Sequence, residues 1–312
     1  MPTRSKDLIL SLATNLDFND YARFLKSARR YCPAETTDIV LLVEPMEARY
    51  IELAEQLQVK LIPIANFSRV IHHSIVLKLA YRIWLLLLQI GTKLKLKGFA
   101  QIRRDATAAW IHPICSRHFF GRDFLSVNPN YRCVLLSDSR DVVFQDNPFE
   151  FVSSNVLNVF AEDPALALGK KNLETEWFKD VFGAKLLRRV AGKLTVCCGT
   201  TMGSPKVILS YLNLMEQEIL NHYTDVVDQS VHNKLVYLDL PKDRVKIHSN
   251  TAGVVLTLGE LPEDAYEILN QQVYVKGQVV PVLHQYDRVP ALKSMLEKLY
   301  DVTPAHPALS RS

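Results

Sequence analysis

Strand and helix patterns alternate over the first part of the 312-residue chain. The apolar runs at residues 8–13, 39–43 and 59–64 are typical of buried strands. Between them, apolar side chains recur with the spacing of one helix face, and Asp17 or Asn19 can cap the first of these helices. A β-α-β-α-β order predicts a parallel, Rossmann-like sheet of the α/β class.

A pair of carboxylates follows the next strand-like run, residues 134–136. They are Asp138 and Asp141, with Ser139 and Arg140 between them. Ligands of open α/β sheets bind at the carboxyl ends of strands, and Mg²⁺ or Mn²⁺ usually shares a few carboxylates with the phosphates of a substrate. Arg140 can pair with the aspartates or contact a diphosphate. The pattern favours a divalent-metal site, and a solvated turn with an Arg–Asp pair is the alternative.

This segment resembles the metal-binding Asp-x-Asp loop of nucleotide-sugar glycosyltransferases with the GT-A fold, in particular the retaining galactosyltransferase and glycogenin-like group. In that family an apolar strand ends in acidic residues, an apolar pair follows, and a short segment closes on proline, as at residues 142–149 here. The chain departs from the family pattern because a strict Asp-x-Asp triplet is missing. If Asp141 is the last aspartate of the motif, Ser139 occupies the usual first position and Asp138 must reach in from one residue earlier.

Two further segments follow the order of that family. The resemblance implies that a basic residue on the helix before the acidic loop faces the phosphates of the donor, and the candidates are Arg117 and Arg122, with Arg117 preferred. Residues 195–205 are rich in small side chains and resemble the glycine loop that lines the sugar site of these enzymes. Small residues in such a loop permit close approach of the backbone to a ligand. We therefore assign Gly199 and Thr200 to the donor-binding set.

The remaining candidates are also implied by the resemblance. Asp228 and Gln229 open a helix, and in related retaining enzymes such a pair lies near the transferred sugar, so they are the candidate catalytic residues. His284 follows a late apolar run, where a histidine completes the metal coordination in that family; a histidine satisfied within the core is the alternative. A neutral imidazole is an acceptable Mn²⁺ ligand. Thr14 and Asn15, at the end of the first strand, are expected beside the base or ribose of the donor.

The charge and the cysteines limit the possible partners and compartment. The net charge of +4, from 37 basic and 33 acidic residues, is too small to indicate nucleic-acid binding but suits an anionic small substrate. Five cysteines, two of them adjacent, do not form a disulfide framework. The residues after Met1 lead directly into the first strand, so we expect no signal peptide and a cytoplasmic protein.

The most apolar stretch, residues 83–90, has basic residues on both sides. Eight residues are too few to cross a bilayer, which requires about 20. We expect a helix buried in the core, and peripheral membrane contact through Trp84 and the neighbouring leucines is the alternative.

Together these features predict one GT-A-like α/β domain with a Rossmann-type mixed sheet over residues 1–302. The nucleotide-binding half is expected at 1–150, the acceptor half at 151–302, and a flexible tail at 303–312. The resemblance implies Mn²⁺- or Mg²⁺-dependent transfer of a sugar from a nucleoside-diphosphate donor, most often UDP-linked, to a hydroxyl acceptor, with a lean towards retention of configuration. The sequence has no P-loop, dinucleotide-binding or serine-hydrolase motif. A catalytically inactive binding or scaffold protein with the same fold is the alternative.

Overall fold

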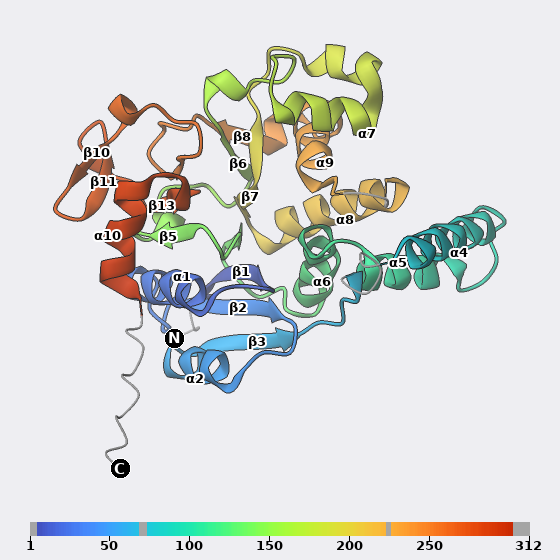
Figure 1. Ribbon diagram of the computed structural model, residues 1–312, viewed down its shortest axis with the longest axis horizontal. Coiled ribbons are helices and arrows are strands. Elements are labelled where there is room, and N and C mark those ends of the chain that lie inside the picture. The colour runs from blue at the N-terminus through green and yellow to red at the C-terminus, as the bar shows by residue number, and fades with distance from the viewer. Residues whose placement is uncertain (1–4, 69–73, 223–225, 302–312) are drawn as a thin grey trace.

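A seven-stranded mixed sheet forms the centre of the protein (Figure 1), seen here in a computed structural model that describes residues 5–68, 74–222 and 226–301. The strand order is β3-β2-β1-β4-β7-β6-β8, with β1 to β4 parallel to one another and β7 antiparallel to both of its neighbours. The α/β class and the mixed Rossmann-type sheet are therefore confirmed. The strands are β1 (Asp7–Ala13), β2 (Thr37–Val43), β3 (Val59–Pro63), β4 (Val134–Ser137), β6 (Leu157–Ala161), β7 (Val196–Gly203) and β8 (Val245–His248).

Helices cover both faces of this sheet because the central strands alternate their apolar side chains. In β1, Leu8 and Leu10 belong to the core under α6 and α8, whereas Ile9 belongs to the core under α1 and α2. Asp17 is the N-cap of α1 and accepts a hydrogen bond from the backbone N–H of Asn19. The helices are α1 (Phe18–Tyr31), α2 (Ala48–Gln56), α6 (Pro113–Val127), α7 (Leu173–Val190), α8 (Pro205–Asn221) and α9 (Asp228–Lys234).

The C-terminal part of the chain returns to the acidic loop through two small sheets. In one of them, β13 pairs antiparallel with β5 and parallel with β9. Helix α10 then packs against α1, where the ammonium group of Lys26 donates to the carbonyl of Tyr300 at 2.7 Å. The elements are β5 (Val142–Phe144), β9 (Val255–Thr257), β10 (Glu267–Leu269), β11 (Gln272–Val275), β12 (Gln278–Val279), β13 (Val282–His284) and α10 (Pro290–Tyr300).

The segment predicted as a glycine loop is a strand instead. Residues 196–203 form β7, which lies between β4 and β6, and the register with β6 shifts at residues 198–200. A buried segment between two strands must pair its backbone N–H and C=O groups, and this requirement outweighs the loop tendency of small residues. The loop prediction is therefore wrong. The register shift is a β-bulge, which leaves Gly199 outside the regular pairing of β7 with β6.

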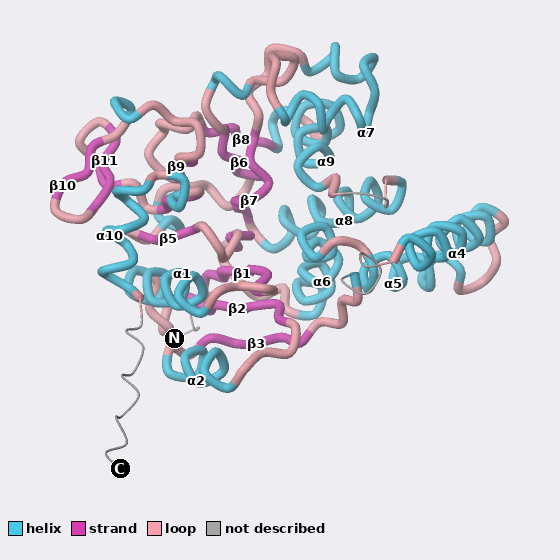
Figure 2. The backbone as a smooth tube through the Cα atoms, viewed as in Figure 1, coloured by secondary structure: helices cyan, strands magenta, loops and turns pink. Residues whose placement is uncertain are grey.

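The apolar stretch at residues 83–90 is not a core helix. It belongs to α4 (Ile75–Lys93), which pairs with α5 (Phe99–Trp110) in a hairpin that projects from the body of the molecule (Figures 1 and 2). Leu85 and Leu88 are buried against α5, but Trp84 is 41% and Leu87 58% exposed. The prediction of a buried helix is therefore wrong. By length and composition alone, α4 could cross a membrane, and only 17% of its apolar window is buried.

The expected tail at 303–312 lies outside the described residues, as do 69–73 and 223–225. The division into a nucleotide-binding half and an acceptor half stays a prediction.

Candidate functional site

The carboxyl ends of β1 and β4 place two of the predicted segments side by side. The strands are parallel, with Ser11 opposite Ser137, so the residues that follow leave the sheet at the same edge. The loops after both strands line one cleft of about 590 Å³. Asn15 adopts a left-handed conformation (φ 53°), which is uncommon outside glycine and concentrates at functional sites. From the predicted set, this cleft is lined by Thr14, Asn15, Arg117, Asp138, Ser139, Arg140 and Asp141.

His284 reaches the acidic loop because β13 pairs with β5. The register sets His284 opposite Val142, and the backbone N–H of Gln285 donates to the carbonyl of Asp141 at 2.8 Å. The Nε2 atom of His284 lies 3.6 Å from Oδ2 of Asp138 and 3.7 Å from Oδ1 of Asp141. The structure therefore brings the three predicted metal ligands together from distant parts of the sequence.

The spacing of these three side chains fits a divalent cation. Their ligand atoms all lie within 4.8 Å of one another. Mg²⁺–oxygen bonds measure about 2.0–2.1 Å, so two ligands of one ion lie up to about 4.2 Å apart. Both distances to the imidazole fall within that limit. Two carboxylates and one imidazole also suit Mn²⁺. The identity of the ion, Mn²⁺ or Mg²⁺, stays a prediction.

The electric field at this cluster favours a cation. Burial opposes ionisation, but the Arg117 guanidinium and His284 hold the pKa of Asp138 below its usual range. Burial, together with the charge of Asp138, raises the pKa of Asp141. Burial alone would lower the pKa of His284, yet the carboxylates of Asp141 and Asp138 raise it. The protein thus draws positive charge to the point between the two aspartates, as expected of a cation site.

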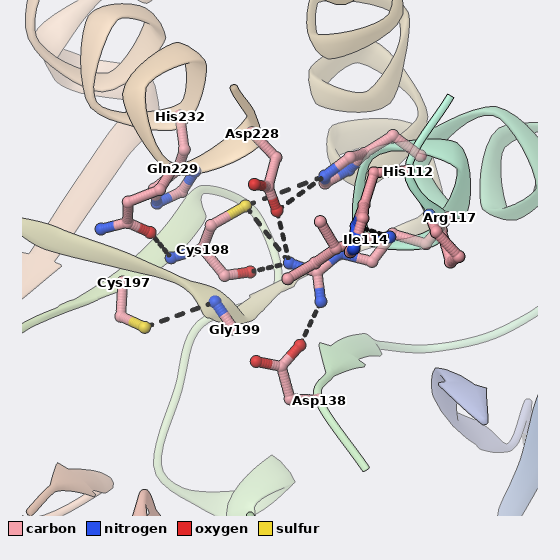
Figure 3. Close-up of polar contacts among 12 residues, drawn as sticks. His112, Ile114, Arg117, Asp138, Cys197, Cys198, Gly199, Asp228, Gln229 and His232 are labelled. Carbon is pink, nitrogen blue, oxygen red and sulfur yellow. Dashed lines mark hydrogen bonds and ion pairs between the residues drawn. The ribbon is translucent and has the colours of Figure 1, made fainter. Parts of the chain in front are cut away.

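Arg117 bridges the candidate metal site and the candidate catalytic pair (Figure 3). Its guanidinium hydrogen-bonds to Oδ1 of Asp138 and, at 3.1 Å, to Oδ2 of Asp228. It also lies 3.3 Å from the carbonyl oxygen of Cys198. Because Oδ1 of Asp138 is held by Arg117, Oδ2 is the oxygen that faces His284. Arg117 therefore orients Asp138; its predicted contact with donor phosphates stays a prediction.

Gly199 leaves room for the histidine ring. A Cβ atom at this position would lie 2.8 Å from Cε1 and 2.9 Å from Nε2 of His284, closer than such contacts occur in proteins. The carbonyl of Gly199 also accepts from the backbone N–H of Asp138 at 2.8 Å. Its neighbour Cys197 places Sγ 3.6 Å from Nδ1 of His284. Gly199 therefore supports the metal cluster, although it does not line the cleft in the described part of the chain.

We expect Gly199→Ala to weaken Mn²⁺ binding by about 10- to 100-fold, because the added methyl group displaces His284 or Asp138. The same overpacking is expected to lower the free energy of unfolding by about 1–3 kcal/mol. Calorimetric titration with Mn²⁺ and urea unfolding in chelator measure the two effects. Gly121→Ala is the matched control, since its Cβ would meet Leu10 at an ordinary 3.6 Å. Unchanged Mn²⁺ affinity in Gly199→Ala would contradict the close-packing explanation.

The candidate catalytic residues are engaged with the protein. The Gln229 side chain accepts from the backbone N–H of Cys198 at 2.8 Å and donates to the carbonyl of Val196 at 2.9 Å, which ties α9 to β7. Asp228 is buried and holds Arg117. Burial opposes its ionisation, but His118 and Arg117 lower the pKa of Asp228. Direct contact of this pair with a sugar stays a prediction.

The three remaining predicted donor-binding residues differ in what they can offer. The hydroxyl of Ser139 is buried and donates to the carbonyl of Leu12 at 2.6 Å, so it joins β4 to β1. Thr200 lies in β7 with its side chain fully buried. Arg140, by contrast, is exposed at the cleft, where its guanidinium donates to the carbonyl of Asn15 at 3.3 Å. Of these three, Arg140 is the one that a donor can reach directly.

The sequence patterns did not indicate two glutamates beside Gln229, of which Glu162 is buried and Glu174 partly buried. Glu162 follows β6 directly, and its carboxylate lies 3.5 Å from the amide nitrogen of Gln229. Burial raises the pKa of Glu162. Burial and the charge of Glu162 raise the pKa of Glu174, on α7, to about 8. The position of Glu162 at a strand end was the available signal, because it is the same one that drew attention to Asp138.

We expect Glu174 to make the protein less stable as the pH rises. The carboxyl releases its proton near 4.5 when unfolded and near 8 when folded, so between these values the folded state binds more protons. The free energy of unfolding should therefore decrease across that window and level off above it. Urea unfolding of wild type and Glu174→Gln in chelator tests this, with exposed Glu176→Gln as control. An identical pH slope in Glu174→Gln would contradict the assignment.

A second cleft of about 430 Å³ adjoins the first. It shares Thr14, Asn15 and Leu16 with the first cleft, and its other wall includes Tyr21 and Tyr50. The hydroxyl of Tyr50 donates to the carbonyl of Leu16 at 3.0 Å, which fixes the loop between the two clefts. Both volumes lie in the range typical of small-molecule sites, about 300–1,000 Å³.

Comparison with solved structures places the chain in a known fold. An active-site mutant of LgtC is 13% identical with a TM-score of 0.51, covering 96% of this chain and 97% of LgtC. Galactosyltransferase LgtC with donor and acceptor sugar analogues is 14% identical (TM-score 0.47; 96% and 98% covered). Core-mannan synthase A from Aspergillus fumigatus, in a Mn/GDP form, is 13% identical (TM-score 0.41; 80% and 73% covered). No protein-family model and no curated protein matches the sequence. The first match shows the fold, so the predicted GT-A-like fold is confirmed.

Proposed function

We propose that this protein is a metal-dependent glycosyltransferase that moves a sugar from a nucleoside-diphosphate donor, with UDP as the expected nucleotide, to a hydroxyl acceptor. LgtC, whose fold the chain shares, is named a galactosyltransferase. The single observation that carries the proposal is the convergence of Asp138, Asp141 and His284 at the carboxyl end of β4, beside a cleft of suitable size. Fold alone does not imply function, and this cluster adds the chemistry.

The residues of the chain have separable roles in this proposal. Asp138, Asp141 and His284 hold the cation, which when bound supplies positive charge against the diphosphate leaving group. Arg117 keeps Asp138 ionised and oriented. Arg140 offers an exposed guanidinium to the phosphates of the donor.

The placement of the donor follows from the two adjoining clefts. Thr14 and Asn15 line both of them, so a donor can lie with its nucleoside in the smaller cleft and its diphosphate at the acidic loop. Gln229 and Glu162 lie on the β7 side, where the sugar and acceptor would meet. We expect retention of configuration, in keeping with the resemblance of the Asp228–Gln229 pair to retaining enzymes. We also propose a cytoplasmic location.

We expect UDP to bind in the presence of Mn²⁺ and to lose measurable binding after chelation. Without a cation, the charges of Asp138 and Asp141 repel a diphosphate. Calorimetric titration with UDP, with and without Mn²⁺, tests this, and a panel of nucleotide sugars with Mn²⁺ identifies the donor through its hydrolysis. Equal affinity for UDP in both conditions would exclude the metal bridge.

A donor-binding protein without catalysis is the second candidate. Two observations favour it: Arg117 holds one oxygen of Asp138, and the amide of Gln229 is bound to the backbone of β7. The two candidates differ in one result, because a scaffold would bind UDP-sugar with Mn²⁺ but would neither hydrolyse nor transfer the sugar.

A further inference from the structure

The exposed apolar side chains of this protein are concentrated on the α4–α5 hairpin. Of the 22 exposed large hydrophobic residues in the described chain, 12 lie between positions 75 and 102. The proposed transferase chemistry uses none of them. Exposed apolar patches of this kind usually mark an interaction surface. The 12 residues are Ile75, Val76, Leu77, Leu79, Ile83, Trp84, Leu86, Leu87, Ile90, Leu94, Leu96 and Ile102.

These side chains form a stripe along the outer face of α4. Leu79, Ile83, Leu86, Leu87 and Ile90 follow the i, i+4, i+7, i+8, i+11 spacing of one helix face. Each of them is between 46% and 59% exposed. A separate, narrower face of the helix packs on α5. The outer stripe is therefore additional apolar surface and not the edge of the hairpin core.

A basic stripe runs beside the apolar one. Lys78, Arg82 and Lys93 share a neighbouring face of α4, because they are spaced by multiples of about one helical turn. Lys95 and Lys97 continue the positive charge into the turn before α5. No acidic residue occurs between positions 74 and 104. Helix α4 and the turn after it are thus apolar and cationic, and Asp105 on α5 forms an ion pair with Arg104 at 3.1 Å.

We propose that the α4–α5 hairpin docks on an anionic lipid bilayer. Helix α4 lies in the plane of the interface, with its apolar stripe in the outer acyl region and its basic stripe at the lipid headgroups. This arrangement is that of interfacial amphipathic helices, to which Lys and Arg add attraction for anionic lipids. Arg82, the eighth residue of α4, would lie in the hydrocarbon region if α4 crossed the bilayer, which makes a spanning orientation costly.

Charge also favours a bilayer over a second copy of the chain as the partner of this surface. A two-fold interface through this face would bring two basic stripes together, since the same patch serves both subunits. A bilayer with anionic headgroups offers the opposite charge over a wide area. Ser68 and His112, which flank the hairpin in sequence, line the larger cleft. Docking therefore keeps the cleft close to the membrane surface.

Vesicle co-sedimentation of the full chain tests the proposal. We expect binding to vesicles of equimolar phosphatidylcholine and phosphatidylglycerol, weaker binding to phosphatidylcholine alone, and loss of the difference at high salt. Lys78→Glu/Arg82→Glu should lower partitioning onto the anionic vesicles by at least about 25-fold, because each surface cation contributes roughly fivefold. Absence of binding to the anionic vesicles would overturn the proposal.

A second pair of variants isolates the apolar stripe. Ile83→Glu/Leu87→Glu changes two exposed side chains and should reduce partitioning by about tenfold or more without lowering the melting temperature. Ile268→Glu/Leu269→Glu is the matched control, because these residues are similarly exposed but lie on β10. Equal partitioning of the stripe variant and the control would overturn the proposal. So would a wild-type dimer in sedimentation velocity that the stripe variant converts to monomer, which would assign the face to a second copy.

Discussion

Asp141→Asn is expected to abolish sugar transfer while the melting temperature in chelator stays the same or increases. The substitution removes one charge at nearly constant volume, so an anionic ligand of the cation is lost. Loss of an interaction that supports a metal typically costs 10- to 100-fold, and we expect about 100-fold or more for the ligand itself. The fold should tolerate the change, because burial and Asp138 already raise the pKa of Asp141 and disfavour its charged form.

Three measurements on this variant are needed together. They are turnover, Mn²⁺ affinity by calorimetry, and melting temperature with Mn²⁺ and with chelator. Wild type should melt at a higher temperature with Mn²⁺ than with chelator, and Asp141→Asn should lose that increase. His284→Ala should lose turnover only in part, because water can take the vacated position. Asp264→Asn, in an exposed turn, is the control. Near-normal turnover of Asp141→Asn, or loss through unfolding, would remove the acidic loop from the proposed mechanism.

The elements that were predicted correctly are those whose secondary structure is determined by residues close to one another in the sequence. The β-α-β-α-β order came from local periodicity, and strands β1, β2 and β3 lie where the apolar runs predicted them. The convergence of His284 with the acidic loop needed the resemblance as well, because nothing local to residue 284 indicates that β13 pairs with β5.

The errors arose where a pattern had more than one physical explanation. Small residues at 196–203 fit a loop, but they also fit a strand that must pass beneath Asp138 and His284, which is where Gly199 lies. An apolar run such as 83–90 indicates only that the segment is more stable in an apolar environment than in water. It does not distinguish burial in a protein core from contact with a lipid bilayer, and α4 is exposed in the structure.

The bridge formed by Arg117 could not be predicted because it joins three elements. The guanidinium comes from α6, and the carboxylates come from the end of β4 and the start of α9. A contact of this kind depends on the tertiary packing of α6 and α9 against the sheet. The resemblance implied only that a basic residue on the helix before the acidic loop faces the donor phosphates, which left Arg122 as a second candidate. In the structure Arg122 instead bonds to Asn213 at 3.0 Å.

Arg117→Met is expected to lower the free energy of unfolding by about 3–5 kcal/mol, the usual cost of removing one partner from a buried ion pair. The side chains of Arg117 and Asp228 are only 12% and 4% exposed, so Asp228 would be left charged and buried without its guanidinium partner. Methionine keeps much of the length and apolar volume of the arginine stem, so the loss reports mainly on charge.

Two further variants decide whether the bridge explains that loss. Arg117→Met/Asp228→Asn removes the unpaired charge and should recover a large part of the stability, whereas additive losses would contradict the bridge. Arg122→Met is the control and should lower the free energy of unfolding by only about 1 kcal/mol, because it loses a partly exposed hydrogen bond to Asn213 and leaves no buried charge unpaired. Urea unfolding in chelator measures all three. The rescued double variant should still bind Mn²⁺ more weakly than wild type, because Asp138 has lost its guanidinium partner. That partner lowers the pKa of Asp138 and orients its Oδ2 atom towards His284. Wild-type Mn²⁺ affinity in that variant would mean that the metal ligands are positioned without Arg117.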